Sequence, residues 1–259
     1  MSRPPVWVQR PDLSSAWRHT AELVGRSAER KSFHTVTVVD DPTLEDASIR
    51  ANVDQLLVNH KFQTVETVAN TIFPLALARS SATPADLVSR YRAMYPRLKH
   101  LDRDNASGTY FGRLIEFPNG ESSVDQLSKI IHRLRTQSAQ KAPMGAAYEV
   151  TYHAADDGLG SLGVYHPSHD NKYRGFPCMS GMSFQRDRTQ LHLLAHYRYE
   201  YLASKGYGNY LGLARLQSYI AKQSELEVGQ LTIVAGRAYL DMTIGRLGQF
   251  LDGLPIEIN

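Results

Sequence analysis

The chain has 259 residues, of which 42% are hydrophobic and 21% charged, a composition that indicates a folded protein and excludes a disordered one. The net charge of +3 is too small to indicate a nucleic-acid partner, and the single cysteine, Cys178, excludes an intramolecular disulfide and a multi-cysteine zinc site. Because we find neither a long apolar stretch nor a signal-peptide core, we expect a cytoplasmic protein with no membrane partner.

The first half of the chain predicts an N-terminal extension and at least two helices. Residues 1–45 are polar and weakly patterned, although residues 34–39 alternate as in a strand, so we place the main domain at residues 46–259. Apolar residues recur at three- and four-residue steps over 85–101 and 124–134, which predicts a helix in each range. Ser122 or Ser123 is expected to cap the second helix.

The second half predicts a sheet with one further helix. Strands are expected over residues 147–153, 177–185, 190–199 and 231–235, with a turn at 186–188 and a loop rich in glycine, histidine and aspartate at 154–174. An amphipathic helix is predicted over residues 210–221. Strands combined with long helices indicate an α+β fold.

Cys178 is the first candidate for chemistry. It follows Pro177 at the start of a predicted strand, with Arg174, Arg186 and Arg198 nearby in the sequence. A nearby guanidinium favours the thiolate, which is the nucleophilic form of cysteine. The alternative is a buried structural cysteine, which is the more common role of a lone cysteine.

A series of short motifs surrounds this cysteine. Arg198 follows Cys178 by 20 positions, and Asn209 follows Arg198 by 11. With this spacing, the segment resembles the thymidylate synthase superfamily, and the resemblance covers about residues 60–242. The motifs that carry it are Pro177-Cys178, Phe184-Gln185, Arg198, Gly206-Tyr-Gly-Asn209 and Leu226-Glu-Val-Gly229, with weaker matches at Tyr110-Phe-Gly112 and Val124-Asp-Gln-Leu127.

The resemblance implies a thymidylate-synthase-like mixed sheet packed with long helices, and a homodimer formed through the sheet. It also implies transfer of a methyl or hydroxymethyl unit from methylenetetrahydrofolate to C5 of a pyrimidine nucleoside monophosphate. In such a reaction, Cys178 would add to C6 of the ring and make C5 nucleophilic.

The resemblance also assigns residues to the nucleotide. Arg198 would bind the phosphate, and Asn209 would pair with the base edge, which favours uracil because relatives that act on cytosine tend to carry aspartate there. Tyr239 and Asp241 stand where the family has His-x-Tyr, so we expect them at the sugar. Gln185 and Tyr110 are also expected near the nucleotide, and the role of Gln185 stays open.

Several positions differ from the family pattern. The proton-relaying glutamate of the family corresponds to Asn70, and Glu66, one turn earlier, is the nearby carboxylate that could replace it. Tyr199 and Tyr201 replace a serine and a folate-contacting aspartate. These differences leave two alternatives open. One is folate-independent C5 chemistry by the same cysteine, such as hydrogen exchange, decarboxylation or dehalogenation, and the other is an inactive nucleotide-binding module.

Two further patterns are expected to be structural. His153, His166, His169 and Asp170 surround the glycine-rich loop, but their spacing fits no zinc motif, so we expect no metal site. Tyr197, Tyr199 and Tyr201 alternate as on one face of a strand, where we expect them to pack rather than to stack on bases.

Overall fold

The computed structural model describes residues 5–101, 105–138, 161–170 and 177–251. Its strands are β1 (Trp7–Asp12), β2 (Lys31–Asp41), β3 (Phe117–Asn119), β4 (Ser122–Val124), β5 (Ser161–Gly163), β6 (Met179–Asp187), β7 (Gln190–Tyr197), β8 (Glu200–Tyr201) and β9 (Glu227–Tyr239). Its helices are α1 (Leu13–Gly25), α2 (Ala47–Asn59), α3 (Val65–Ile72), α4 (Leu75–Arg79), α5 (Pro84–Leu101), α6 (Tyr110–Ile115), α7 (Gln126–Ser138), α8 (Tyr207–Gln223) and α9 (Ile244–Leu251).

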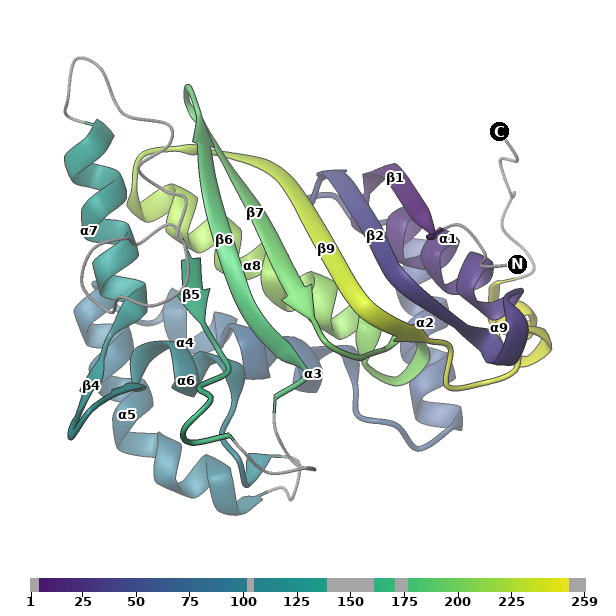
Figure 1. Ribbon diagram of the computed structural model, residues 1–259, viewed down its shortest axis with the longest axis horizontal. Helices are drawn as coiled ribbons and strands as arrows, with labels where there is room; N and C mark the ends of the chain where they lie inside the picture. Colours follow the sequence, from purple (N-terminus) through teal and green to yellow (C-terminus); the bar gives the residue numbers. More distant parts are fainter. Residues whose placement is uncertain (1–4, 102–104, 139–160, 171–176, 252–259) are drawn as a thin grey trace.

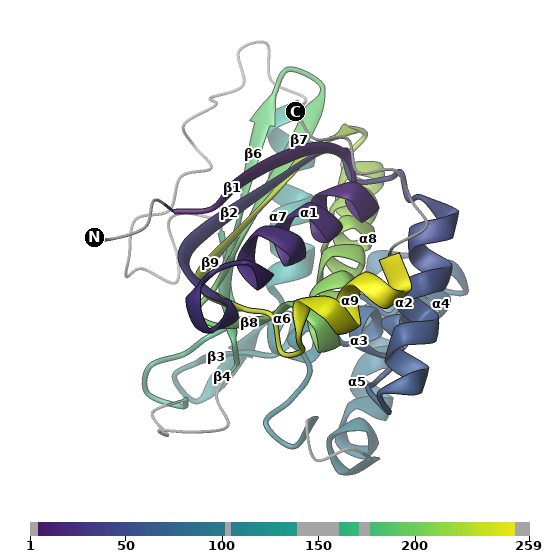
Figure 2. The ribbon, with the colours of Figure 1, turned by 90° about the vertical axis from the view of Figure 1, so that its right-hand side faces the viewer.

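The main sheet is mixed and has the strand order β1-β2-β9-β7-β6-β5, with β8 paired to β9. β2 and β9 are antiparallel, β9 and β7 are parallel, and β7 and β6 form an antiparallel hairpin. The helices lie on one side of this sheet (Figures 1 and 2). The predicted α+β class is therefore confirmed.

Most of the predicted helices and strands in the described residues are confirmed, with three differences. The range predicted as a loop, 154–174, contains β5, and the hairpin turn lies at 188–189 instead of 186–188. The third difference is at a helix start. α7 begins at Gln126, and its first turn is capped by Asp125, whose carboxylate accepts a hydrogen bond from the Ser128 amide at 3.0 Å. Ser122 and Ser123 lie in β4 instead, so neither is the cap. The strand predicted at 147–153 lies outside the described residues.

Residues 7–41 contribute β1, α1 and β2, and both strands pair within the main sheet. Asp12 caps α1, because its carboxylate accepts a hydrogen bond from the Ser15 amide at 2.9 Å. Trp17, Ala21 and Val24 then recur at helical spacing and are completely buried. The N-terminal segment is thus part of the same sheet and helical layer as the residues that follow it.

α8 is the central helix of the layer and packs against α3. The two helices approach closely because α8 has glycine at two contact positions: a Cβ on Gly212 would lie 2.8 Å from the Ala69 carbonyl oxygen, and one on Gly208 would lie 2.5 Å from Val68. Buried Gln217 donates hydrogen bonds to the carbonyl oxygens of Leu191 and Gly229, at 2.8 and 2.9 Å. These contacts fix α8 against the sheet.

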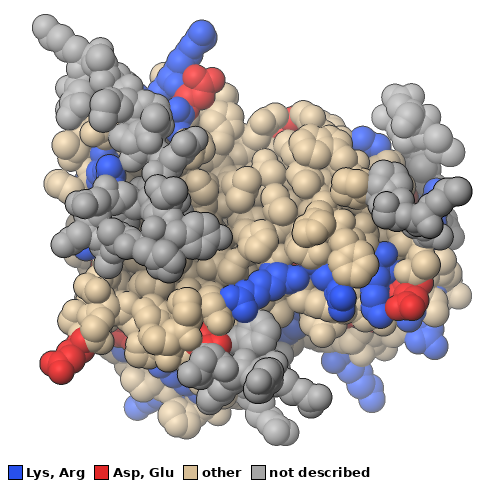
Figure 3. Space-filling view, viewed as in Figure 1, with Lys and Arg blue, Asp and Glu red and all other residues tan. Residues whose placement is uncertain are grey.

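No described helix covers the opposite face of the sheet (Figure 2). Leu194 of β7 alternates with buried Leu193 and Ala195, so it points to this open face, where it is 39% exposed. Trp7 of β1 points the same way beside buried Val8 and is 63% exposed. Figure 3 shows this face, with a row of lysine and arginine side chains across its lower part.

Candidate active site

A cavity of about 390 Å³ opens between α3, the loop before α6, the start of β6 and the start of α8. Three of the predicted site residues, Cys178, Asn209 and Tyr110, contribute to its wall. The other lining residues are Gln63, Val68, Thr71, Asn105, Ser107, Gly108, Thr109, Arg113, Pro177, Tyr199, Tyr201 and Lys205.

Cys178 lies immediately before β6 and is half-buried. Its carbonyl oxygen accepts a hydrogen bond from the Arg198 amide at 2.8 Å, which joins it to the residue that follows β7. Burial, followed by the negative charge of Glu200, raises the pKa of the thiol, while Lys205 and Arg198 act in the opposite direction. Arg198 thus acts as we expected, but burial outweighs it, and the thiol is the resting form at neutral pH.

Asn209 lies in the first turn of α8 and is 6% exposed. A short π-helical segment, Leu202–Gly206, leads into this turn. Buried Trp17 of α1 donates a hydrogen bond to the Leu202 carbonyl oxygen at 2.8 Å, and Asp241 accepts one from the Ala203 amide at 2.9 Å. Two distant parts of the sequence therefore hold the segment that presents Asn209 to the cavity.

Tyr110 completes this group at the start of α6. Its phenol oxygen accepts hydrogen bonds from the backbone of Met179 and Cys178, and burial raises its pKa. Arg198 lies beside the group, close enough to act on the charge of Cys178, and its guanidinium stacks over the Tyr165 ring at 3.4 Å from the centroid. Arg198 does not itself line the cavity.

The structure places Gln185, Tyr239 and Asp241 away from the cavity wall. Gln185 lies far along β6, opposite His192. The Tyr239 ring packs 6.4 and 6.2 Å from those of Tyr199 and Tyr201. Asp241 is already used by backbone amides of the π-helical segment. None of the three therefore lies in the cavity wall, where the sequence analysis expected it to contact the nucleotide.

Glu66 and Asn70 also lie outside the cavity. Val68 and Thr71 form the cavity-facing side of α3, and Asn70, two positions from Val68, is exposed on another side. Glu66 binds Arg215 in a bidentate pair at 2.7 and 2.8 Å. Hydrogen bonds from Arg215 and Arg50 hold the pKa of Glu66 at about 2. These positions correct the expectation that Glu66 relays protons in place of the family glutamate, and they also put Asn70 outside the cavity.

Tyr197, Tyr199 and Tyr201 were expected to pack together on one face of a strand, and this holds only in part. Tyr197 is fully buried, whereas Tyr199 and Tyr201 lie in the cavity wall, and Tyr201 is 41% exposed. The Tyr199 and Tyr201 rings lie 4.8 Å apart. The difference arises because the chain bends between β7 and β8, so the alternation of β7 ends at Tyr197.

Sequence analysis missed Glu200, the first residue of β8, which is 2% exposed. Its carboxylate accepts a hydrogen bond from the Asn209 side chain, and burial raises the pKa of Glu200 to about 8. Its Oε1 atom has no hydrogen-bond partner among the described residues. An acidic residue between two tyrosines carries no sequence signal for such burial, because the burial depends on pairing with distant β9.

Arg113 was also missed. It is the ion-pair partner of Asp170, the acidic residue of the histidine-rich loop. Arg113 lines the cavity and binds Asp170 in a bidentate pair at 2.8 and 2.9 Å. Asp170 also accepts a hydrogen bond from the His166 amide. No group of three or more histidine, cysteine or acidic side chains within the described ranges could hold a metal ion. His153 lies outside those ranges.

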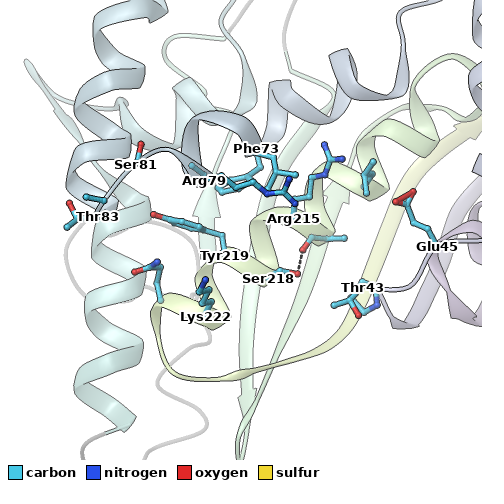
Figure 4. Close-up of a pocket in the computed structure, with 17 residues that line it drawn as sticks. Thr43, Glu45, Phe73, Arg79, Ser81, Thr83, Arg215, Ser218, Tyr219 and Lys222 are labelled. Atoms are coloured by element: carbon cyan, nitrogen blue, oxygen red, sulfur yellow. Dashed lines mark hydrogen bonds between the residues drawn. The ribbon is translucent and has the colours of Figure 1, made fainter. Parts of the chain in front are cut away.

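A larger cavity of about 760 Å³ lies between α4, α8 and the loop after β2. Figure 4 shows Arg79, Arg215 and Lys222 around it, with the Tyr219 ring beside Phe73. Its lining includes neither a cysteine nor any other residue that the sequence analysis singled out. The Cys178 cavity is therefore the better candidate for chemistry.

The comparisons with known proteins found no match that could assign a role to the Cys178 cavity, so its assignment rests on its geometry. No protein-family model matches the sequence, and a search of curated proteins also found no match. None of the helices in the described part of the chain has the length and apolar character needed to span a bilayer.

Proposed function

We propose that the protein transfers a one-carbon unit, methyl or hydroxymethyl, to C5 of a pyrimidine nucleoside monophosphate of the uracil type. The observation that carries the proposal is the convergence of Cys178 and Asn209, from opposite ends of a strand–strand–helix segment, on one cavity wall. Addition to a flat, hydrogen-bonding ring requires a nucleophile and a hydrogen-bonding group that face the same cavity, and a thiol and an amide meet this requirement.

The two side chains have complementary tasks in this proposal. The Cys178 sulfur adds to C6 of the ring, and negative charge develops on O4 as C5 becomes nucleophilic. An N–H of the Asn209 amide donates to O4, and its carbonyl oxygen accepts from N3–H. Lys205 in the cavity wall and Arg198 beside it supply positive charge for the phosphate.

Methylenetetrahydrofolate would supply the one-carbon unit. Tyr199 and Tyr201 offer aromatic surface for a flat pterin ring at the cavity wall. However, the described lining includes no carboxylate that could accept hydrogen bonds from the amino groups of that ring. The fit to folate is therefore incomplete, and the tasks of Cys178 and Asn209 do not depend on it.

This incomplete fit favours a second candidate, which is C5 chemistry on the same nucleotide without folate. Addition of Cys178 to C6 also activates C5 toward hydrogen exchange, decarboxylation or dehalogenation. The observation in its favour is that the described lining of the cavity holds no carboxylate for the amino groups of a folate donor.

We also propose that the protein is a homodimer formed through its open sheet face. Exposed Trp7 and Leu194 lie on this face, and no described helix covers it. A large apolar side chain on an uncovered sheet face is better buried against a second copy than left in water.

The test is a mass-spectrometric assay of UMP, dUMP, CMP and dCMP, with and without methylenetetrahydrofolate. A one-carbon product that needs the donor and disappears in Cys178→Ser supports the first candidate, and C5 tritium release without the donor supports the second. Ser218→Ala, in the larger cavity, is the matched control. Full activity of Cys178→Ser on every nucleotide would contradict both candidates, and tight binding without turnover would indicate a binding module.

A further inference from the structure

The larger cavity, between α4, α8 and the loop after β2, has no part in the chemistry proposed above. Its volume of about 760 Å³ lies in the range of pockets that hold small organic molecules. The wall combines an apolar side, which includes Phe73, Leu75 and Leu211, with the three basic residues shown in Figure 4. The composition of the wall therefore suits a ligand with an apolar body and a negative charge.

Two of the charged residues in this wall already have ion-pair partners within the protein. Arg215 forms its bidentate pair with Glu66. Glu45, the one carboxylate in the described lining, binds Arg50 at 3.1 Å and accepts a hydrogen bond from the Tyr207 hydroxyl at 3.0 Å. These contacts leave Arg215 and Glu45 little charge for a ligand.

Arg79 and Lys222 provide positive charge that is free to bind a ligand. Arg79 ends α4 and Lys222 lies in the last turn of α8; both are exposed, and neither has an ion-pair partner among the described residues. Arg135 of α7, which binds the Gln223 carbonyl oxygen, adds a positive charge that acts on Tyr219. This part of the cavity therefore attracts anions.

Tyr219 provides a flat surface beside these cations. Its ring centroid lies 5.0 Å from that of Phe73, which is 1% exposed and anchors the contact in the core. Lys222 follows Tyr219 by three positions, so both lie on one side of α8. In Figure 4, Arg79 and Lys222 lie on two sides of the Tyr219 ring. The Tyr219 hydroxyl has no hydrogen-bond partner among the described residues, so it can donate to a ligand.

We propose that the larger cavity binds a small aromatic phosphate monoester, with the phosphate between Arg79 and Lys222 and the ring against Tyr219. A phosphate monoester carries nearly two negative charges at neutral pH, so it matches two cations better than a singly charged carboxylate does. The ring gains aromatic contact with Tyr219. The described lining shares no residue with that of the Cys178 cavity, so the inference goes beyond the proposed function and does not rest on it.

Isothermal titration calorimetry of the wild-type protein, with phenyl phosphate as the probe, tests the inference. Phenyl phosphate is expected to bind about fivefold more tightly than methyl phosphate, which lacks the ring, and about fivefold more tightly than benzoate, which lacks the second charge. Equal affinity for phenyl phosphate and either comparison compound would overturn the inference, as would no binding of phenyl phosphate at millimolar concentration. These comparisons need no variant.

Substitutions then locate the bound probe. Arg79→Gln and Lys222→Gln are each expected to weaken the binding of phenyl phosphate about tenfold, and both side chains are exposed, so neither change should disturb folding. Arg246→Gln, which removes an exposed arginine from α9, is the matched control and should leave the affinity unchanged.

Lys205→Gln makes the same chemical change in the wall of the Cys178 cavity. An unchanged affinity for phenyl phosphate in this variant supports binding in the larger cavity. A loss equal to that in Lys222→Gln would place the probe at Cys178 and overturn the inference, and so would unchanged affinity in both Arg79→Gln and Lys222→Gln.

Discussion

Asn209 contains both the donor and the acceptor that recognition of uracil requires. In Asn209→Asp, the amide N–H that faces O4 becomes a second acceptor, so we expect the affinity for UMP to fall by about tenfold or more. The affinity for CMP should fall less, because its amino group can donate to a carboxylate. Isothermal titration calorimetry with both nucleotides measures the two changes.

The exposed Asn59→Asp, on α2, is the control for this substitution, since it makes the same chemical change away from the cavity. Equal loss of UMP and CMP affinity in Asn209→Asp would contradict the assignment of Asn209 to the base edge.

Glu200 should make the stability of the protein depend on pH. Its pKa is raised from an ordinary value of 4.5 to about 8, so the folded state binds more protons than the unfolded state between these two values. Its contribution to stability is therefore fully present below about pH 4.5 and is lost as pH rises through about 8. The loss can reach about 1.4 kcal/mol per pH unit. Glu200→Gln should flatten this part of the profile.

Urea denaturation of wild type and Glu200→Gln at half-unit steps from pH 5 to 9 tests this prediction. As pH rises, the free energy of unfolding of wild type should fall relative to that of Glu200→Gln. Parallel profiles would show that the Glu200 carboxyl is no harder to ionise in the folded state than in the unfolded state.

The contact between α3 and α8 depends on the absence of a side chain at Gly212. A methyl group there would lie 2.8 Å from the Ala69 carbonyl oxygen and 2.8 Å from Ile72 Cβ, so the helices must separate. We expect Gly212→Ala to lower the free energy of unfolding by about 1–3 kcal/mol. Because α3 and α8 both line the Cys178 cavity, the same variant should also weaken nucleotide binding.

Gly245→Ala is the control for this prediction, because a Cβ at Gly245 has no neighbour within 4 Å. In α9 the added methyl should be neutral or stabilise the helix by up to about 1 kcal/mol. Urea denaturation compares the two variants, and equal effects would contradict the close-packing argument.

Local patterns predicted the elements that have clear periodicity. Residues 85–101 carry a regular apolar stripe and form α5, and the strand–turn–strand pattern after Cys178 forms the hairpin of β6 and β7. α1 was missed because the sequence analysis assigned residues 1–45 to a weakly patterned extension, although Trp17, Ala21 and Val24 recur there at helical spacing.

The candidate site was predictable where its residues lie close in sequence. Cys178 and Asn209 flank one continuous strand–strand–helix segment, and its spacing predicted that they lie near each other, as they do in the wall of one cavity. Asp241 and Glu200 could not be assigned in this way. The backbone amides that Asp241 binds, and the strand that buries Glu200, are brought to them only by the tertiary fold.

The open sheet face determines how the whole molecule is expected to assemble. Leu194 points out of the middle of this face and is 39% exposed. If two copies pack through it, Leu194→Asp would bury an unpaired charge at the contact and should convert dimer to monomer. Light scattering after size-exclusion chromatography measures the change.

Val58→Asp is the matched control, because Val58 is 63% exposed but belongs to α2 in the helical layer. It should leave the mass in solution unchanged. A wild-type protein that is monomeric at every concentration would contradict assembly through the sheet.

The place of β9 in the sheet affects the order of events during synthesis on the ribosome. β9 lies between β2 and β7, although it is formed by residues 227–239. Until these residues have left the exit tunnel, the strands made earlier remain as two separate pieces, each with an unpaired edge. A nascent chain at this stage is therefore vulnerable to aggregation, and a chaperone that shields strand edges should raise the yield of folded protein.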